Sequence, residues 1–116
     1  MRIRQERINE LLRQEISKLI LTEVKDPRLG FVTVNRVTTN NDLSYAKVYI
    51  TIMGKQSDVN KSLIALNSAK DYIKVQVGKK INIRYMPEIE FFIDTKMDET
   101  LKLLQTMEKD KEEHGY

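Results

Sequence analysis

The chain has 116 residues and no cysteine. This length suffices for one domain that buries a core without covalent cross-links. The absence of cysteine excludes a disulfide framework, a thiolate zinc site and a cysteine nucleophile. Residues 1–86 hold 16 Lys or Arg and 8 Asp or Glu, whereas residues 87–116 hold 4 and 9, so the net charge of +3 conceals a basic body and an acidic tail. Such a body suits a polyanionic partner and a mixed solvated surface equally well.

The amino terminus begins a charged amphipathic pattern rather than an apolar signal core. No stretch approaches the length of apolar chain that spans a bilayer. We therefore expect a cytoplasmic protein with no membrane partner, and we expect it to be a monomer.

The first predicted helix covers residues 4–23. Apolar residues recur along it at three- and four-residue steps and form one core-facing stripe, which comprises Ile8, Leu11, Leu12, Ile16, Leu19 and Ile20. The run Asp26-Pro27-Arg28-Leu29-Gly30 then stops the helix.

Two β-rich runs follow, at residues 31–39 and 45–52, with a turn at 40–42 between them. In the second run the aliphatic residues Ala46, Val48, Ile50 and Ile52 alternate with polar and aromatic ones. In the first run Val37 is out of phase with the earlier valines, which predicts a bulge near Asn35-Arg36. The pattern indicates an antiparallel pair with one apolar face and an open face carrying Thr33, Asn35, Tyr45, Lys47 and Tyr49.

From residue 57 to residue 77 the apolar positions keep one helical phase, but Asn67-Ser68 interrupts them. We predict two helices joined at a kink around Ser68-Ala69-Lys70. Residues 89–94 form a third strand. The predicted fold class is therefore α+β, in the order α-β-β-α-kink-α-β, with the helices on one face of a three-stranded sheet.

The domain is expected to comprise residues 1–95. A short helix over residues 96–107 follows, with Met97, Leu101 and Leu104 on one side. Residues 108–116 have no apolar face and are predicted to be disordered.

The sequence offers no framework for catalysis. The only histidine, His114, lies in the charged tail, and no glycine-rich phosphate loop occurs. Glu88, Glu90 and Asp94 alternate on a strand and could in principle hold a metal, although solvated surface carboxylates are the commoner outcome. We expect no enzymatic activity, no metal and no cofactor.

Several motifs, in the same order along the chain, resemble the bacterial ribosome-binding factor A family, a version of the type II KH fold. They are Asp26-Pro27-Arg28-Leu29 with Val32-Thr33-Val34-Asn35-Arg36-Val37, Asp42-Leu43 with Ala46-Lys47-Val48-Tyr49-Ile50, Leu66-Asn67-Ser68-Ala69, and Arg84-Tyr85-Met86-Pro87-Glu88-Ile89 with Phe91. The resemblance implies a non-catalytic assembly factor that binds the immature small (30S) ribosomal subunit and its 16S rRNA. It also implies support for late assembly and for processing of the 16S rRNA 5′ end, departure before translation, and a particular need in the cold.

The chain departs from ordinary KH domains at the predicted kink. Those domains place a Gly-x-x-Gly loop there, so that backbone amides approach single-stranded RNA. Here the junction reads Ser68-Ala69-Lys70-Asp71, whose side chains block close backbone approach. The resemblance implies a kinked helix with an alanine in place of that loop, so a generic four-nucleotide clamp is not expected.

RNA contact would then come from side chains. The candidates are basic residues of the second helical region and its flanks, with further charge and stacking area on the open sheet face: Lys61, Lys70, Lys74, Lys79, Lys80 and Arg84, then Arg36, Tyr45 and Lys47. Each lysine alone is more simply a solvated residue, but their clustering favours RNA. Arg28 is equally suited to tie the turn to Asp26 and to contact RNA. An alternative function is a protein-binding adaptor that docks through the amphipathic helix at residues 97–107.

Overall fold

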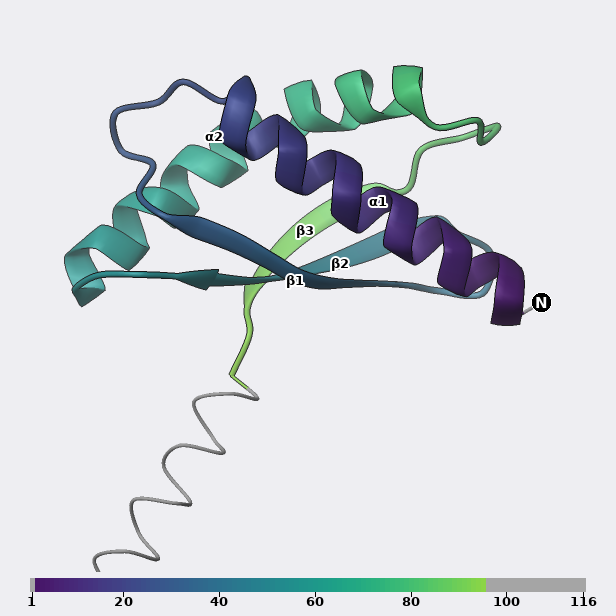
Figure 1. Ribbon diagram of the computed structural model, residues 1–116, viewed down its shortest axis with the longest axis horizontal. Coiled ribbons are helices and arrows are strands. Elements are labelled where there is room, and N and C mark those ends of the chain that lie inside the picture. The colour runs from purple at the N-terminus through teal and green to yellow at the C-terminus, as the bar shows by residue number, and fades with distance from the viewer. Residues whose placement is uncertain (1, 96–116) are drawn as a thin grey trace, which may run out of the picture.

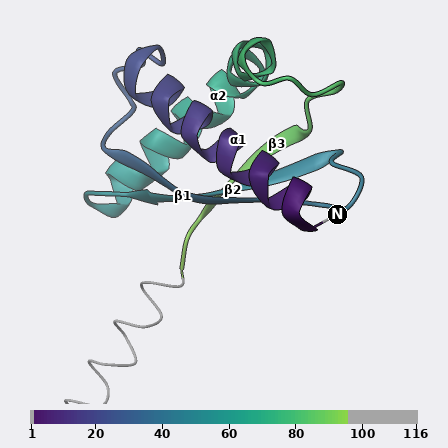
Figure 2. The same cartoon turned by 45° about the vertical axis from the view of Figure 1, so that its right-hand side comes forward.

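The computed structural model describes residues 2–95, which form two helices and a three-stranded sheet (Figure 1). The elements are, in chain order, α1 (Arg2–Thr22), β1 (Val32–Thr39), β2 (Tyr45–Ile52), α2 (Gln56–Lys80) and β3 (Glu88–Ile93). Both helices lie on the same face of the sheet (Figures 1 and 2). The predicted α+β class is confirmed. The predicted helix at 96–107 and the tail at 108–116 lie outside the described residues.

The strand order is β1-β2-β3, with β1 antiparallel to β2 and β3 parallel to it. A parallel return requires a long crossover, and the 25-residue helix α2 supplies it. None of the helices described is both long enough and apolar enough to cross a membrane.

Helix α1 covers β1 with a stripe of apolar side chains, of which Leu12 and Ile16 are fully buried. The predicted stripe is wrong at Leu11, which is 46% exposed. Leu11 lies at the margin of the stripe, about 100° around the helix from the fully buried Leu12, and its side chain reaches solvent.

The bulge predicted in the first strand is confirmed. The β1–β2 register shifts between Val34 and Arg36, so no residue of β2 stands opposite the extra residue Asn35 in the register. Both Val34 and Val37 therefore point into the core, at 3% and 5% exposure. On β2 the predicted alternation holds, since Ala46, Val48, Ile50 and Ile52 are all buried.

Helix α2 is one helix and not two. Its secondary structure is unbroken from Gln56 to Lys80, which corrects the predicted count. Its two halves nevertheless point in different directions in both views, so the predicted change of direction is present (Figures 1 and 2). At the middle of the helix the Ser68 hydroxyl donates to the carbonyl oxygen of Ile64 at 2.9 Å. A serine bonded back to the preceding turn bends a helix without breaking it.

Candidate nucleic-acid interface

The turn after α1 is held against the bend of α2 by polar contacts. Arg28 donates to both carboxylate oxygens of Asp26, at 2.7 Å from Nη2 to Oδ2 and 3.1 Å from Nε to Oδ1. The same Nη2 lies 3.5 Å from the Ser68 hydroxyl oxygen. Of the two roles open to Arg28, the structure shows the tie to Asp26. The Asp-Pro-Arg motif thus connects the helix stop to the bend.

The buried Ser62 makes a second connection between α2 and this turn. Its hydroxyl oxygen accepts a hydrogen bond from the backbone N–H of Gly30 at 2.9 Å. The hydroxyl itself points at the Arg28 carbonyl oxygen, 3.5 Å away. Ser62 is fully buried and was not singled out from the sequence, because its partner lies 32 residues away along the chain.

The Arg28 side chain, through its hydrogen bonds, lowers the pKa of Asp26 to about 2. A carboxylate with a lowered pKa stabilises the fold above its ordinary pKa near 4, and this contribution disappears as the pH falls through about 2. We expect the Asp26 carboxyl to titrate near pH 2 in the native protein and near its ordinary pKa in Arg28→Ala, measured by the carboxyl ¹³C shift. An unchanged titration in the variant would contradict the pairing.

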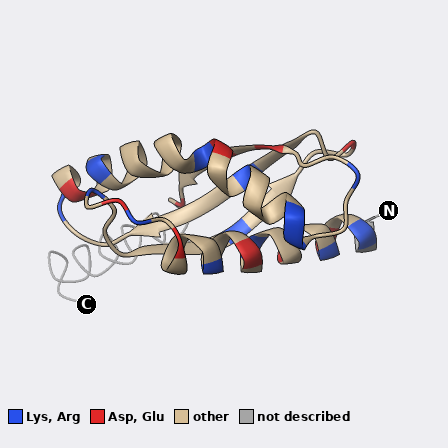
Figure 3. Cartoon of the chain, turned by 90° about the horizontal axis from the view of Figure 1, so that it is seen from above, with Lys and Arg blue, Asp and Glu red and all other residues tan. Residues whose placement is uncertain are grey.

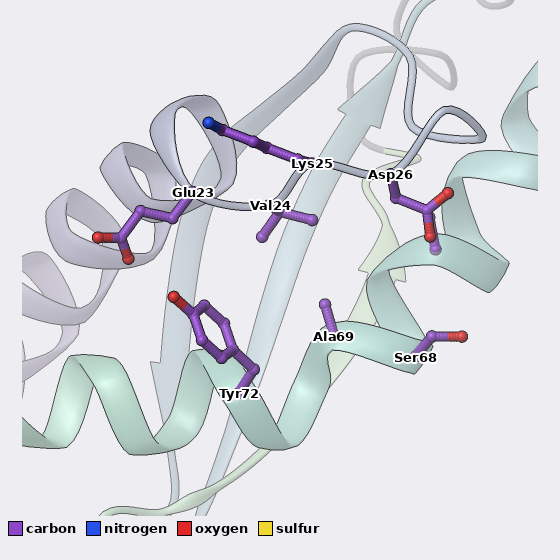
Figure 4. A pocket seen from close by; sticks show the side chains of 8 residues that line it. Glu23, Val24, Lys25, Asp26, Ser68, Ala69 and Tyr72 are labelled. Atoms are coloured by element: carbon purple, nitrogen blue, oxygen red, sulfur yellow. The ribbon is translucent and has the colours of Figure 1, made fainter.

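The bend of α2 adjoins a shallow hollow of about 280 Å³ (Figure 4). Val24 and Ala69 point toward one another across it, and the ring of Tyr72 stands beside them. An ordinary KH loop would leave its backbone open here. Instead the helix continues through Ser68 and Ala69, with the side chain of Ala69 half-buried. That Ser68 and Ala69 stand in place of the KH loop stays a prediction.

The basic residues of α2 do not form one line. Lys70 and Lys74 are one turn apart, and Lys74 forms an ion pair with Glu88 of β3. Lys80 points instead toward α1, where its Nζ lies 4.0 Å from Glu15 Oε2. The predicted basic cluster is therefore spread around the helix: at about 100° per residue, Lys79 and Lys80 are both turned well away from the side that carries Lys70 and Lys74. Figure 3 shows basic residues spread along α2 with acidic ones between them.

The basic residues also differ in whether they form an ion pair with a carboxylate. Glu88 has a lowered pKa, chiefly because Lys74 donates a hydrogen bond to it and more weakly because Lys70 is near. Lys61, Lys70 and Lys79 form no ion pair with any residue between 4 and 95. These three cations can meet a phosphate without first giving up a carboxylate.

The bulge places a cation on the open face of the sheet. Because Asn35 is the extra residue of the bulge, the Arg36 side chain lies on the open face of the sheet and not on the core side. Its guanidinium carbon lies 3.7 Å from the centre of the Tyr49 ring. Arg36 Nη2 also lies 3.8 Å from Oδ1 of Asp94, and Asn35 Nδ2 donates to the other carboxylate oxygen, Oδ2, at 3.0 Å. This packed arrangement fixes Arg36 but covers one face of Tyr49, which leaves less of that ring for stacking.

The rest of the open face mixes charges. Lys47 lies above the ring of Phe92, 5.7 Å from its centre, and that ring packs 5.9 Å from the Tyr49 ring. Tyr45 and Lys47 line a hollow of about 250 Å³ beside the β1–β2 turn. Period-two alternation places Glu88, Glu90 and Phe92 of β3 on the polar side, and Asp94 follows the strand. These carboxylates make the open face less basic than the predicted contacts Arg36 and Lys47 suggested.

Sequence reasoning missed Phe92 on this face, although the same alternation identifies it. Arg84 follows α2, and its guanidinium carbon lies 5.4 Å from the centre of the Tyr85 ring. Among residues 4–95, no three His, Cys, Asp or Glu side chains gather in a way that could hold a metal ion.

Comparison with known proteins places the chain in a family. The family model described as Ribosome-binding factor A matches residues 4–107. A ribosome-binding factor A from Carboxydothermus hydrogenoformans is 40% identical over 110 residues, covering 95% of this chain and 88% of the relative. One from Desulfitobacterium hafniense is 41% identical with the same coverage.

Solved structures share the fold. The crystal structure of ribosome-binding factor A from Thermus thermophilus superposes with a TM-score of 0.68 at 24% identity, covering 77% of this chain and 94% of that one. The solution structure of a Thermotoga maritima protein, 34% identical, superposes with a TM-score of 0.62 over 75% of this chain and 87% of that one. The family motifs, the bent helix and the family match over residues 4–107 agree with one another. The chain belongs to the ribosome-binding factor A family.

Proposed function

We propose that this protein is an assembly factor that binds the immature 30S ribosomal subunit through its 16S rRNA. The observation that carries the proposal is family membership: relatives named ribosome-binding factor A are about 40% identical over nearly the whole chain. A Thermus thermophilus member has been fitted into a cryo-EM map of a 30S complex, and its fold matches this one with a TM-score of 0.65.

The finer part of the proposal concerns timing. We place the protein in late assembly, where it supports processing of the 16S rRNA 5′ end and leaves before translation begins. It requires no cofactor and no catalytic group, because an RNA chaperoning role needs only binding that differs between immature and mature subunits.

RNA contact is proposed to begin at Lys61, Lys70 and Lys79, which have no carboxylate partner among the described residues. Three other predicted contacts are proposed to exchange partners on binding. Lys74 would leave Glu88, Lys80 would leave Glu15, and Arg36 would leave Asp94. Arg84, Tyr45 and Lys47 flank these positions. Because the helix is continuous at Ser68 and Ala69, recognition relies on side chains and on the shape of folded RNA.

Sedimentation tests the function directly. The tagged protein is expected to travel with free 30S subunits and to be depleted from translating ribosomes on a sucrose gradient. Affinity should fall steeply with salt, with a log–log slope of roughly −4 to −6 for about five to seven phosphate contacts. A flat salt response, or equal presence on translating ribosomes, would refute the proposal.

A further inference from the structure

A hollow of about 400 Å³ lies at the end of the sheet where β2 and β3 begin. Three segments that are distant in the sequence line it: the first turn of α1, the turn between β1 and β2, and the connection from α2 to β3. All three lie at the end of the molecule marked N in Figures 1 and 2. The hollow shares no lining residue with the one beside the bend of α2. Its volume falls within the range of pockets that hold small ligands, about 300–1,000 Å³.

Hydrogen bonds between these segments hold the walls of the hollow in place. The backbone N–H of Glu88 donates to the carbonyl oxygen of Ser44 at 2.9 Å, which joins the start of β3 to the β1–β2 turn. Gln5 Nε2 donates to the Thr39 carbonyl oxygen at 2.6 Å, which fixes the first turn of α1 beside the end of β1. Arg4 is next to Gln5, so its backbone is held at the edge of the hollow. The hollow is therefore formed before any ligand binds.

One side of the hollow is apolar. Leu43, Ile83 and Met86 are half-buried there and pack against the core. Gly78 of α2 makes room for Met86, because a Cβ at Gly78 would lie 2.8 Å from the Met86 Cγ. The Tyr85 side chain also lines the hollow and is 74% exposed. An exposed aromatic ring next to apolar side chains offers a surface on which a flat ring can stack.

Two arginines line the same hollow and have no carboxylate partner. Neither Arg4 nor Arg84 forms an ion pair with any residue between 4 and 95. Glu88, which also lines the hollow, is already paired with Lys74. A guanidinium binds phosphate through two parallel N–H donors, so two unpaired arginines at one hollow indicate a phosphate group in the ligand.

The second carboxylate of the hollow has an oxygen that can accept a further hydrogen bond. Asp42 Oδ1 accepts from the backbone N–H of Ser44 at 3.1 Å and from its hydroxyl at 2.7 Å. Asp42 Oδ2 accepts no hydrogen bond from residues 4–95. The bonds from Ser44, chiefly that from its hydroxyl, lower the pKa of Asp42, so this carboxylate is only an acceptor at neutral pH. A free acceptor beside two arginines suits a ligand that carries both a phosphate and a hydroxyl group.

We propose that this hollow binds one unpaired nucleotide of RNA. The phosphate contacts Arg4 and Arg84, and the base stacks on Tyr85. The ribose 2′-hydroxyl donates to Asp42 Oδ2, a contact that DNA cannot make. A base inside a duplex is stacked on both faces, so only an unpaired one can reach the ring. The inference rests on the proposed binding of RNA, and it adds a separate site to the lysines proposed above.

Binding of a short, fluorescently labelled oligouridine to the free, full-length protein tests the site without the ribosome. Tyr85→Ala should weaken binding at least about 5-fold, and Tyr85→Phe, which keeps the ring, should bind within about 2-fold of the unmodified protein. Arg4→Ala should weaken binding at least about 10-fold, because a charge-assisted contact is lost. The matched control is Arg7→Ala, which removes the same charge one turn along α1 and outside the hollow, and its binding should stay within a few-fold. Fluorescence anisotropy measures all four affinities.

The role of Asp42 is measured by comparing RNA with DNA. The unmodified protein should bind oligouridine several-fold more tightly than oligodeoxyuridine. Asp42→Asn keeps an oxygen for Ser44 and replaces Oδ2 by an amide nitrogen, which cannot accept a hydrogen bond. This variant should therefore lose the preference for RNA.

Equal losses of affinity in Arg4→Ala and Arg7→Ala, or NMR signals of Ile83 and Tyr85 that do not move on addition of oligouridine, would overturn the proposal. Signals that move with an oligoglutamate peptide and not with RNA would also overturn it, since the hollow would then take an acidic protein segment. Sedimentation with 30S subunits is measured separately, so a failure of this site is distinguishable from a failure of the proposed function.

Discussion

Replacing Lys70 and Lys79 together by glutamate is expected to weaken binding to 30S subunits by at least about 100-fold. Each removes a charge-assisted contact that contributes about 1.5–3 kcal/mol, and the new carboxylates repel phosphate. The log–log salt slope should also become shallower by about 2, because two fewer counterions are released. Titration of labelled protein with subunits at several salt concentrations measures both quantities.

The matched control is Lys25→Glu/Lys55→Glu. It changes the net charge by the same amount at exposed positions on the turn after α1 and just before α2. Its binding should stay within a few-fold of the unmodified protein. Equal loss in both double variants would show that total charge, and not the placement of Lys70 and Lys79, governs association.

Replacing Leu66 by alanine is expected to lower the free energy of unfolding by about 2–5 kcal/mol. Leu66 is fully buried on α2 just before its bend, and truncation leaves a cavity beneath the helix. A loss of this size is a large part of the stability of a small domain, which is about 5–15 kcal/mol in total. Urea denaturation followed by circular dichroism measures it, with an unchanged m-value showing that the same fold unfolds.

Ile64→Ala is the matched control on the same helix. Ile64 is 52% exposed and lies two residues from Leu66, so its truncation should change the free energy of unfolding by less than about 1 kcal/mol. A loss at Ile64 as large as that at Leu66 would mean that Ile64 is covered in the intact protein.

Local patterns in the sequence predicted most of the fold. The alternation through Val48 and Ile50 identified β2, and the phase change at Val37 identified the bulge, because both depend on neighbours along one strand. The prediction for Leu11 was wrong because the sequence alone does not distinguish a leucine at the margin of the apolar stripe from one within it. The way in which α1 packs on the sheet determines which of these leucines is buried.

The candidate site was predictable only in part, since ion pairs join distant segments. Arg28 and Asp26 are two residues apart, so their pairing was foreseeable as one of two outcomes. Glu88 is 14 residues from Lys74 and Glu15 is 65 residues from Lys80. No helical or strand period links such positions, so the division of the lysines into paired and unpaired groups required the structure.

The strand order has a consequence for aggregation. Because β2 is central, β1 and β3 both present an outer edge of the described sheet, and a regular outer edge is a template for pairing with another chain. The bulge at Asn35 interrupts the regular spacing of β1, while β3 is only six residues long and begins with the carboxylates of Glu88 and Glu90. An irregular edge and a short, charged one both oppose growth of the sheet between molecules, which suits a protein that must stay dispersed between encounters with its target.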